Sequence, residues 1–347
     1  MNALHRLPLL FAAACALVLA ALGIGRTLPG EQIAFSYAAA RDAGYRIDLA
    51  DISRGMRVPL RLPEPSVRLR GWADRGHLIV GLVSGKVALY TLAGQGRPLH
   101  LPSQCAPPLV TVSTRWLTCV ERTAQAQVRL MTLDCALAGC TQSSAPITLA
   151  GFALQFAFSP DERLLAALHI DGSVRALSLY ETANGVLLWQ SPPGQAGVTA
   201  PTWSLDGTRL AYYDDTADGL DLNVLEVASL RLMRHALLQE RTTIAYALSW
   251  SPDSSQVIVH YSSVNSETDA PHWWIADLSS GQQQAWAGST AQDMRPLWSP
   301  SGEQVIVTRR FGGRFGGRLF VLDEAGAAWQ VTASQLLDVN AFWRPGG

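Results

Sequence analysis

A short phrase recurs through the second half of the chain: an aromatic residue, then Ser, then Pro or Leu, then turn-forming residues. Its four versions start 45, 47 and 48 positions apart, at Phe158, Trp203, Trp250 and Trp298. Each is followed by an apolar run, a polar loop and a second alternating run. Short β runs between turn residues at a fixed period are typical of a repeated four-stranded sheet. The repeat therefore predicts an all-β chain.

Weaker copies precede these four. One unit begins at Trp72, and another uses the runs 110–113, 116–121 and 128–133 without the Pro-Asp-Gly turn.

The first and last segments together supply one more unit. Segments 33–37 and 45–51 match its second and third strands, and the missing opening phrase lies at 340–347. A unit shared between both ends lets the C-terminal strand pair with N-terminal strands and remove an open edge. We therefore predict a seven-bladed β-propeller of four-stranded antiparallel blades, closed by pairing the C-terminal strand with the N-terminal blade.

The sequence resembles the TolB-type β-propeller repeat in its Trp-Ser-Pro-Asp-Gly phrase and in the Ile-Ala-Phe-like strand that follows. The match is strong over 153–347 and loose over 33–150. The resemblance implies a ring, an exported setting and a binding or scaffolding role, and it carries no catalytic residue over to this chain.

The repeated phrase itself is read as structural. Its large aromatic ring can fill the space between blades, and Pro, Asp and Gly favour turns. We assign to packing the residues Trp203, Trp250, Trp298 and Trp343, and to turns the residues Asp161, Asp206 and Asp253.

Composition excludes several classes of protein. With 48% apolar and 16% charged residues, the chain can bury a large core and is not a disordered protein. A formal net charge of −1 argues against a protein that coats nucleic acid, because such proteins need an excess of cations.

The N-terminal segment predicts export. Residues 7–24 are uncharged and follow His5 and Arg6, which is typical of a signal peptide or of a single hydrophobic helix that anchors the chain in a membrane. Both outcomes stay open for a segment 1–28, followed by one propeller domain over 29–347. That domain is expected outside the cytoplasm, as a membrane-anchored, secreted or periplasmic body.

Four cysteines crowd together: Cys105, Cys119, Cys135 and Cys140. Their spacing lacks the short paired knuckles of a zinc site, so disulfides are the better interpretation. Cys135 and Cys140 are close enough to staple a hairpin turn, which leaves Cys105 with Cys119. Three pairings are possible from the sequence.

Three loops between second and third strands are the candidate sites, because these connections share one face of a propeller. The first, 214–221, offers four carboxylates that could hold calcium, which prefers oxygen ligands; a solvated acidic turn is the alternative. Its acids are Asp214, Asp215, Asp218 and Asp221.

The second loop, 262–272, leads to His272, Trp273 and Trp274. These residues could form an exposed recognition site, or the two tryptophans could lie on opposite faces of a strand.

The third loop, 309–318, repeats Phe-Gly-Gly-Arg and suits an anionic polymer, a lipid headgroup or an acidic partner, whereas a hairpin without a ligand is the alternative. Its candidate residues are Arg309, Arg310, Arg314 and Arg318.

Sequence patterns of catalysis are sparse: there is no Gly-x-Ser-x-Gly, no phosphate-binding Gly-Lys-Ser/Thr loop and no His-Glu-x-x-His. We predict a monomeric, non-enzymatic module that binds a protein or an envelope polymer through loops on one face, with no nucleic acid and no cofactor other than possible calcium. The alternative is a propeller enzyme, a lyase or hydrolase working at the axial channel.

Overall fold

The computed structural model of the chain describes most of residues 31–344. The described ranges are 31–38, 45–52, 55–63, 66–84, 86–101, 115–121, 127–139, 147–149, 151–172, 174–192, 199–216, 219–238, 243–263, 273–311, 317–332 and 337–344.

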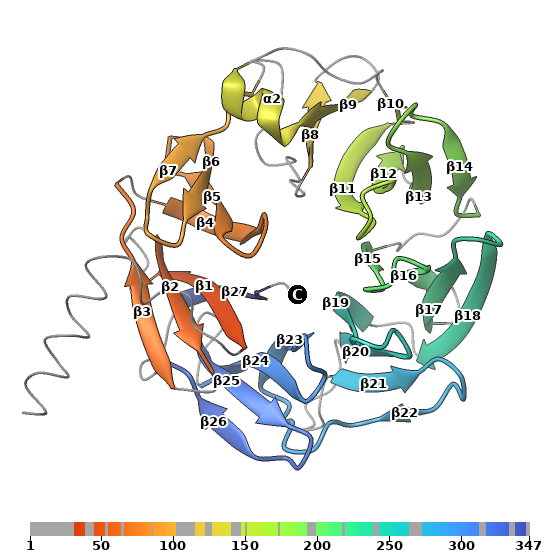
Figure 1. Ribbon diagram of the computed structural model, residues 1–347. Helices are drawn as coiled ribbons and strands as arrows, with labels where there is room; N and C mark the ends of the chain where they lie inside the picture. The colour runs from red at the N-terminus through yellow and green to blue at the C-terminus, as the bar shows by residue number, and fades with distance from the viewer. Residues whose placement is uncertain are drawn as a thin grey trace, which may run out of the picture.

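Short antiparallel strands group into seven blades around a central axis (Figure 1), which confirms the all-β seven-bladed propeller. The strands of each blade follow from the innermost described strand outward. Blade 1 is β27 (Leu337–Trp343), β1 (Gln32–Ala38), β2 (Tyr45–Asp51) and β3 (Met56–Leu60); blade 2 is β4 (Ser66–Trp72), β5 (His77–Leu82), β6 (Val87–Thr91) and β7 (Gly96–Pro98); blade 3 is β8 (Trp116–Glu121), β9 (Gln127–Thr132) and β10 (Ile147–Thr148).

Blade 4 is β11 (Phe152–Phe158), β12 (Leu164–Asp171), β13 (Val174–Glu181) and β14 (Leu187–Gln190); blade 5 is β15 (Thr199–Trp203), β16 (Arg209–Thr216), β17 (Gly219–Glu226) and β18 (Arg231–Leu238); blade 6 is β19 (Thr243–Trp250), β20 (Gln256–Ser263), β21 (Trp273–Asp277) and β22 (Gln283–Gln284); blade 7 is β23 (Asp293–Trp298), β24 (Gln304–Arg310), β25 (Gly317–Asp323) and β26 (Ala328–Gln330).

Blade 1 contains strands from both ends of the described chain. β27 pairs antiparallel with β1, with Trp343 opposite Ile33 and Ala341 opposite Phe35. β1 then pairs with β2, so the last strand occupies the innermost position of the first blade (Figure 1). Residues 110–113, predicted as the innermost strand of blade 3, lie outside the described residues.

The core lies between the blades. In the described part of the chain, buried apolar side chains form seven clusters, each shared by two consecutive blades. Strand β16 shows how alternation produces this: Leu210 and Tyr212 pack toward blade 4, whereas Ala211 and Tyr213 pack toward blade 6. Because successive side chains point to opposite faces of a strand, both faces of each blade can be apolar.

Tryptophans connect blades through hydrogen bonds as well as packing. In four cases the indole Nε1 donates to a carbonyl oxygen on the inner strand of the preceding blade. The pairs are Trp203 to Ala157 at 3.0 Å, Trp250 to Thr202 at 2.9 Å, Trp343 to Leu297 at 3.0 Å and Trp72 to Phe342 at 3.3 Å. Trp298 donates instead to Gly302 O of its own turn at 3.1 Å. The packing role predicted for these tryptophans is confirmed.

The Ser-Pro-Asp phrase forms one hydrogen-bonded turn, seen clearly in blade 6. Ser251 Oγ donates to Asp253 Oδ1 at 2.6 Å, and the backbone N–H of Gln256 donates to Ser251 Oγ at 2.9 Å. The hydroxyls of Ser159 and Ser204 contact their aspartates in the same way. The aspartates are therefore turn-forming groups, as the sequence predicts.

A short helix occupies the segment in which a disulfide-bonded hairpin turn was predicted. Helix α2 (Leu133–Ala138) begins after Thr132, whose side chain accepts from Cys135 N, and ends at Gly139 with φ of 75°. Threonine at the N-cap and glycine in the left-handed conformation at the C-cap favour this helix over a turn. The hairpin-turn prediction for this segment is wrong.

Cysteine burial fits disulfide chemistry. Cys119 and Cys135 are buried between blades 2 and 3, and both are disulfide-bonded. Cys105 and Cys140 lie outside the described residues, so the pairing stays a prediction.

Within the residues that the structure describes, no helix is long and apolar enough to span a bilayer. The segment 1–28 lies outside them, so the hydrophobic helix and the anchor stay predictions.

We expect deletion of Asn340–Gly347 to lower the free energy of unfolding by about 3–5 kcal/mol, because it removes the packing of Trp343 and most of the β1–β27 pairs. Chemical denaturation measures the loss. Deleting only 345–347, beyond β27, is the control and should change little. An unchanged midpoint for the longer deletion would show that the shared blade contributes nothing to stability.

The turn aspartates predict a defined pH dependence. Hydrogen bonds, first of all from Ser251, hold the pKa of Asp253 below its ordinary value. A carboxyl group whose pKa is lower in the folded state stabilises the fold above its unfolded pKa of about 3.9, and this contribution is lost as pH falls through the folded pKa. Asp253→Asn should therefore be less stable than the parent at pH 7 and approach it in acid. Denaturation between pH 2 and pH 7 tests this, and a constant difference would contradict it.

Candidate binding face

The strand ends that flank the three predicted loops lie on one face of the ring, which we call the loop face. It carries the connections between second and third strands, together with the links between blades. The loops join β16 to β17, β20 to β21 and β24 to β25. They belong to blades 5, 6 and 7, which are consecutive (Figure 1). The topology thus brings the three loops to neighbouring positions.

In blade 5 the acidic loop is a tight hairpin whose flanking carboxylates turn inward. Asp214 and Asp221 are direct cross-strand partners and are only 5% and 7% exposed. The Arg234 guanidinium forms an ion pair with Asp221. Burial and the nearby Asp214 charge raise the pKa of Tyr212. Asp214 and Asp221 are therefore interior groups of the blade rather than solvated acids.

The calcium prediction concerns the same hairpin. The side chains of Asp215 and Asp218 lie outside the described residues. No group of three or more potential metal-ligating His, Cys, Asp or Glu side chains occurs in the described part of the chain.

In blade 6 the structure rules out Trp273 as part of an exposed recognition site and confirms the alternative, in which the two tryptophans lie on opposite faces of a strand. The Trp273 side chain is fully buried, and its ring stacks on Trp286 with centroids 6.4 Å apart. Trp286 in turn meets Trp298 of blade 7 edge-on at 5.8 Å. Trp274 packs on the opposite side, toward blade 5, as strand alternation predicts. His272 lies outside the described residues.

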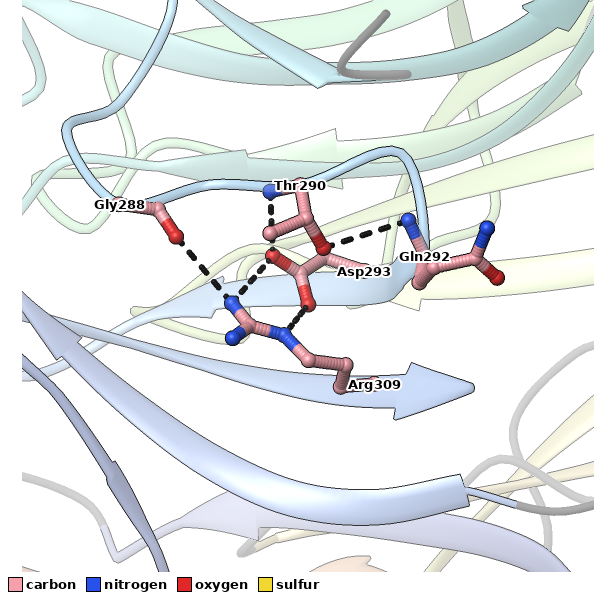
Figure 2. Close-up of polar contacts among 5 residues, drawn as sticks. All are labelled: Gly288, Thr290, Gln292, Asp293 and Arg309. Atoms are coloured by element: carbon pink, nitrogen blue, oxygen red, sulfur yellow. Dashed lines mark hydrogen bonds and ion pairs between the residues drawn. The ribbon is translucent and has the colours of Figure 1, made fainter. Parts of the chain in front are cut away.

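In blade 7 the best-defined charged group is a buried ion pair between Asp293 and Arg309 (Figure 2). Asp293 is fully buried, and its two carboxylate oxygens accept from Arg309 Nε at 2.6 Å and from a terminal nitrogen at 2.9 Å. The backbone N–H of Thr290 also donates to Asp293 at 2.8 Å, and Arg309 donates to Gly288 O at 3.2 Å. Charge-assisted bidentate bonds of this kind compensate a buried carboxylate. Arg309 is thus committed to an internal partner.

Aromatic rings extend this ion pair toward the loop. The guanidinium carbon of Arg309 lies 4.8 Å from the Phe320 ring centroid, and that of Arg318 lies 4.8 Å from Phe311. The two phenylalanine rings are 6.0 Å apart. We call Arg309, Phe320, Phe311 and Arg318 the arginine–phenylalanine ladder. Its outer part is accessible: Phe311 is 41% exposed, Arg318 is partly exposed and the adjacent Arg310 is exposed.

The predicted arginines of the loop face thus differ in exposure. Arg309 is internal, Arg310 and Arg318 reach the surface, and Arg314 lies outside the described residues. Sequence reasoning missed Asp293, because an isolated acid at the start of an inner strand has no motif, and its pairing with Arg309 depends on the register of β23 and β24. It also missed a second buried network on blade 1, formed by Tyr37, Asp48 and Arg57.

The sequence matches no protein-family model, and no curated protein matches it significantly. Solved structures share its fold. An oligogalacturonate lyase from Vibrio parahaemolyticus aligns with a TM-score of 0.63 and 12% identity, over 80% of this chain and 83% of that one. A puromycin-hydrolyzing peptidase from Mycobacterium tuberculosis aligns with a TM-score of 0.62 and 12% identity, over 88% of this chain and 52% of that one.

A putative TolB from Agrobacterium tumefaciens aligns over 91% of this chain and 98% of that one, with 15% identity and a TM-score of 0.49. Identities this low speak for the fold alone. By its seven blades and these alignments, the chain is a seven-bladed β-propeller in fold.

The Asp293–Arg309 pair makes a sharp stability prediction. Arg309→Met should cost about 3–5 kcal/mol, because it leaves a buried carboxylate without its cation. The double variant Asp293→Asn/Arg309→Met should recover part of that loss. Arg310→Gln, at the neighbouring exposed position, is the control and should stay within about 0.5 kcal/mol. Equal effects at positions 309 and 310 in denaturation experiments would refute the assignment.

Proposed function

We propose that this protein is an exported binding or scaffold module that recognises a protein or cell-envelope ligand through the loop face. The observation that supports the proposal is that the strands flanking the segments 214–221, 262–272 and 309–318 end on one face of three consecutive blades. The turns on the opposite face repeat one compact structure in blades 4, 5 and 6. The segments that vary between these blades therefore lie on the loop face, whereas the opposite face carries nearly identical turns.

An acidic partner suits the exposed part of the arginine–phenylalanine ladder. Guanidinium groups bind carboxylates and phosphates in a bidentate manner, and the Arg318 guanidinium lies over the face of the Phe311 ring. Arg310, Arg314, Arg318 and His272 are the residues proposed to contact the ligand. Calcium at Asp214, Asp215, Asp218 and Asp221 remains an additional proposal, in which Asp221 would have to leave or share Arg234.

Export is proposed from the segment 1–28, acting as a signal peptide or as a membrane anchor. The disulfide bonding of Cys119 and Cys135 supports it, because disulfides persist in oxidising compartments outside the cytoplasm. We propose the pairs Cys105–Cys119 and Cys135–Cys140, and a monomeric propeller.

A second candidate function is enzymatic, as a lyase or hydrolase at the axial channel. It is favoured by the fold similarity to an oligogalacturonate lyase and to a peptidase. The two candidates differ in outcome, since a binding module returns its ligand unchanged whereas an enzyme shortens it.

The test compares two charge-matched double variants. Arg310→Gln/Arg318→Gln alters the loop face, whereas Arg163→Gln/Arg231→Gln removes two exposed arginines from turns of the opposite face. Immobilised protein is incubated with an envelope extract, and retained components are quantified by mass spectrometry. We expect the loop-face variant to lose at least ten-fold of the specifically retained material and the control to keep it.

Equal retention by both variants would place recognition elsewhere. Equal loss would reveal a nonspecific charge effect, and progressive shortening of the retained ligand would favour the enzyme.

A further inference from the structure

A cavity on blade 1 lies outside all three loops. Its volume is about 530 Å³, and its lining comes from β1, β2, β3 and the link that follows β3. The cavity lies at the loop-face end of blade 1, because Tyr37 and Tyr45, near the facing ends of β1 and β2, and residues 61–63 of that link line it. Its size falls within the range of small-molecule pockets.

The polar end of the cavity is Asp48, which is only 3% exposed. Asp48 Oδ2 is occupied: Arg57 Nε forms an ion pair with it, and the Tyr37 hydroxyl donates to it at 3.3 Å. A terminal nitrogen of Arg57 donates to the Tyr37 hydroxyl oxygen at 2.9 Å, which closes the network. Asp48 Oδ1 is buried and has no hydrogen-bond partner among the described residues. A buried carboxylate oxygen without a hydrogen-bond partner is costly, so a ligand that donates a hydrogen bond to it would bind favourably.

The charge of the cavity is positive. Arg57 balances Asp48, whereas Arg46 and Arg61 also line the cavity and are exposed. No ion pair of Arg46 or Arg61 with an acidic group occurs within the described residues. Two guanidinium groups at the entrance of a partly apolar cavity suit a carboxylate or another anion.

The donor that suits Asp48 is a hydroxyl rather than an ammonium group. Arg57 already lies against the same carboxylate, so a second cation would meet like-charge repulsion in a buried place, whereas a neutral hydroxyl would not. Pro59, Leu60, Leu62 and Pro63 supply an apolar wall, which suits the C–H face of a sugar ring.

We propose that this cavity binds an acidic saccharide of one or two sugar units, with its carboxylate on Arg46 and Arg61 and a hydroxyl donating to Asp48. The site is separate from the loops and does not depend on the proposed function. Loss of ligand binding at the three loops would leave binding in the cavity intact, and loss of binding in the cavity would leave binding at the three loops intact.

The first test keeps the protein unmodified and varies the ligand. D-glucuronate, D-glucose, D-glucosamine and cyclohexanecarboxylate are compared by saturation-transfer NMR and calorimetry. We expect D-glucuronate to bind at least ten-fold more tightly than the others, because only it combines the anion with hydroxyl donors. Equal binding of D-glucose, tighter binding of D-glucosamine, equal binding of cyclohexanecarboxylate, or no binding of D-glucuronate would each overturn the proposal.

The second test locates the site. Arg46→Gln/Arg61→Gln should weaken D-glucuronate binding at least ten-fold, since both side chains are exposed and their loss should leave the fold intact. Arg97→Gln, an exposed arginine on the outer strand of blade 2, is the control and should bind as the parent does. Unchanged binding by the double variant, or equal loss in the control, would show that the sugar binds elsewhere.

Discussion

The contact between consecutive blades is the interaction on which the rest of this structure depends. Each blade is a small sheet with two apolar faces, so it is stable only when neighbours cover both. Seven buried clusters in the described residues supply that cover, and the indole–carbonyl bonds fix how neighbouring inner strands align. The cluster between blades 7 and 1 joins Ile306 and Val321 to Ile33 and Phe35, and so connects segments from opposite ends of the chain.

The interfaces between blades become polar toward the loop face. There the apolar rows end in Asp48, Asp221 and Asp293, each paired with an arginine of its own blade. These pairs compensate buried charge and contribute little net stability by themselves. The ion pairs also determine which arginines are accessible to a ligand. Arg309 is bound to Asp293, whereas Arg310, Arg46 and Arg61 are exposed. The buried ion pairs thus separate the arginines that hold the blades together from those that a ligand on the loop face could contact.

Much of the fold could be read from local pattern. The Trp-Ser-Pro-Asp phrase predicted both the turn at Ser251 and the wedge at Trp250, because each depends on residues close in sequence or on strand alternation. The side-chain contacts of the candidate site were harder to predict from the sequence. Strand alternation predicted that one of Trp273 and Trp274 is buried, but nothing in the sequence marked Trp286 as the ring on which Trp273 stacks. The helix at 133–138 was missed because its N-cap, Thr132, was assigned to the strand run 128–133, and its C-cap, Gly139, was assigned to the hairpin turn between Cys135 and Cys140.

By itself, the sequence determined the class of fold, the number of repeats and the face on which the three loops emerge, since a period of about 45 residues and the alternation within strands are local properties. Only the tertiary structure decided which charges are internal. Asp293 meets Arg309 across a strand pair, and Asp48 meets Arg57 and Tyr37 across three strands. Such partners depend on strand register and side-chain packing, which bring together residues that no spacing in the sequence marks as neighbours.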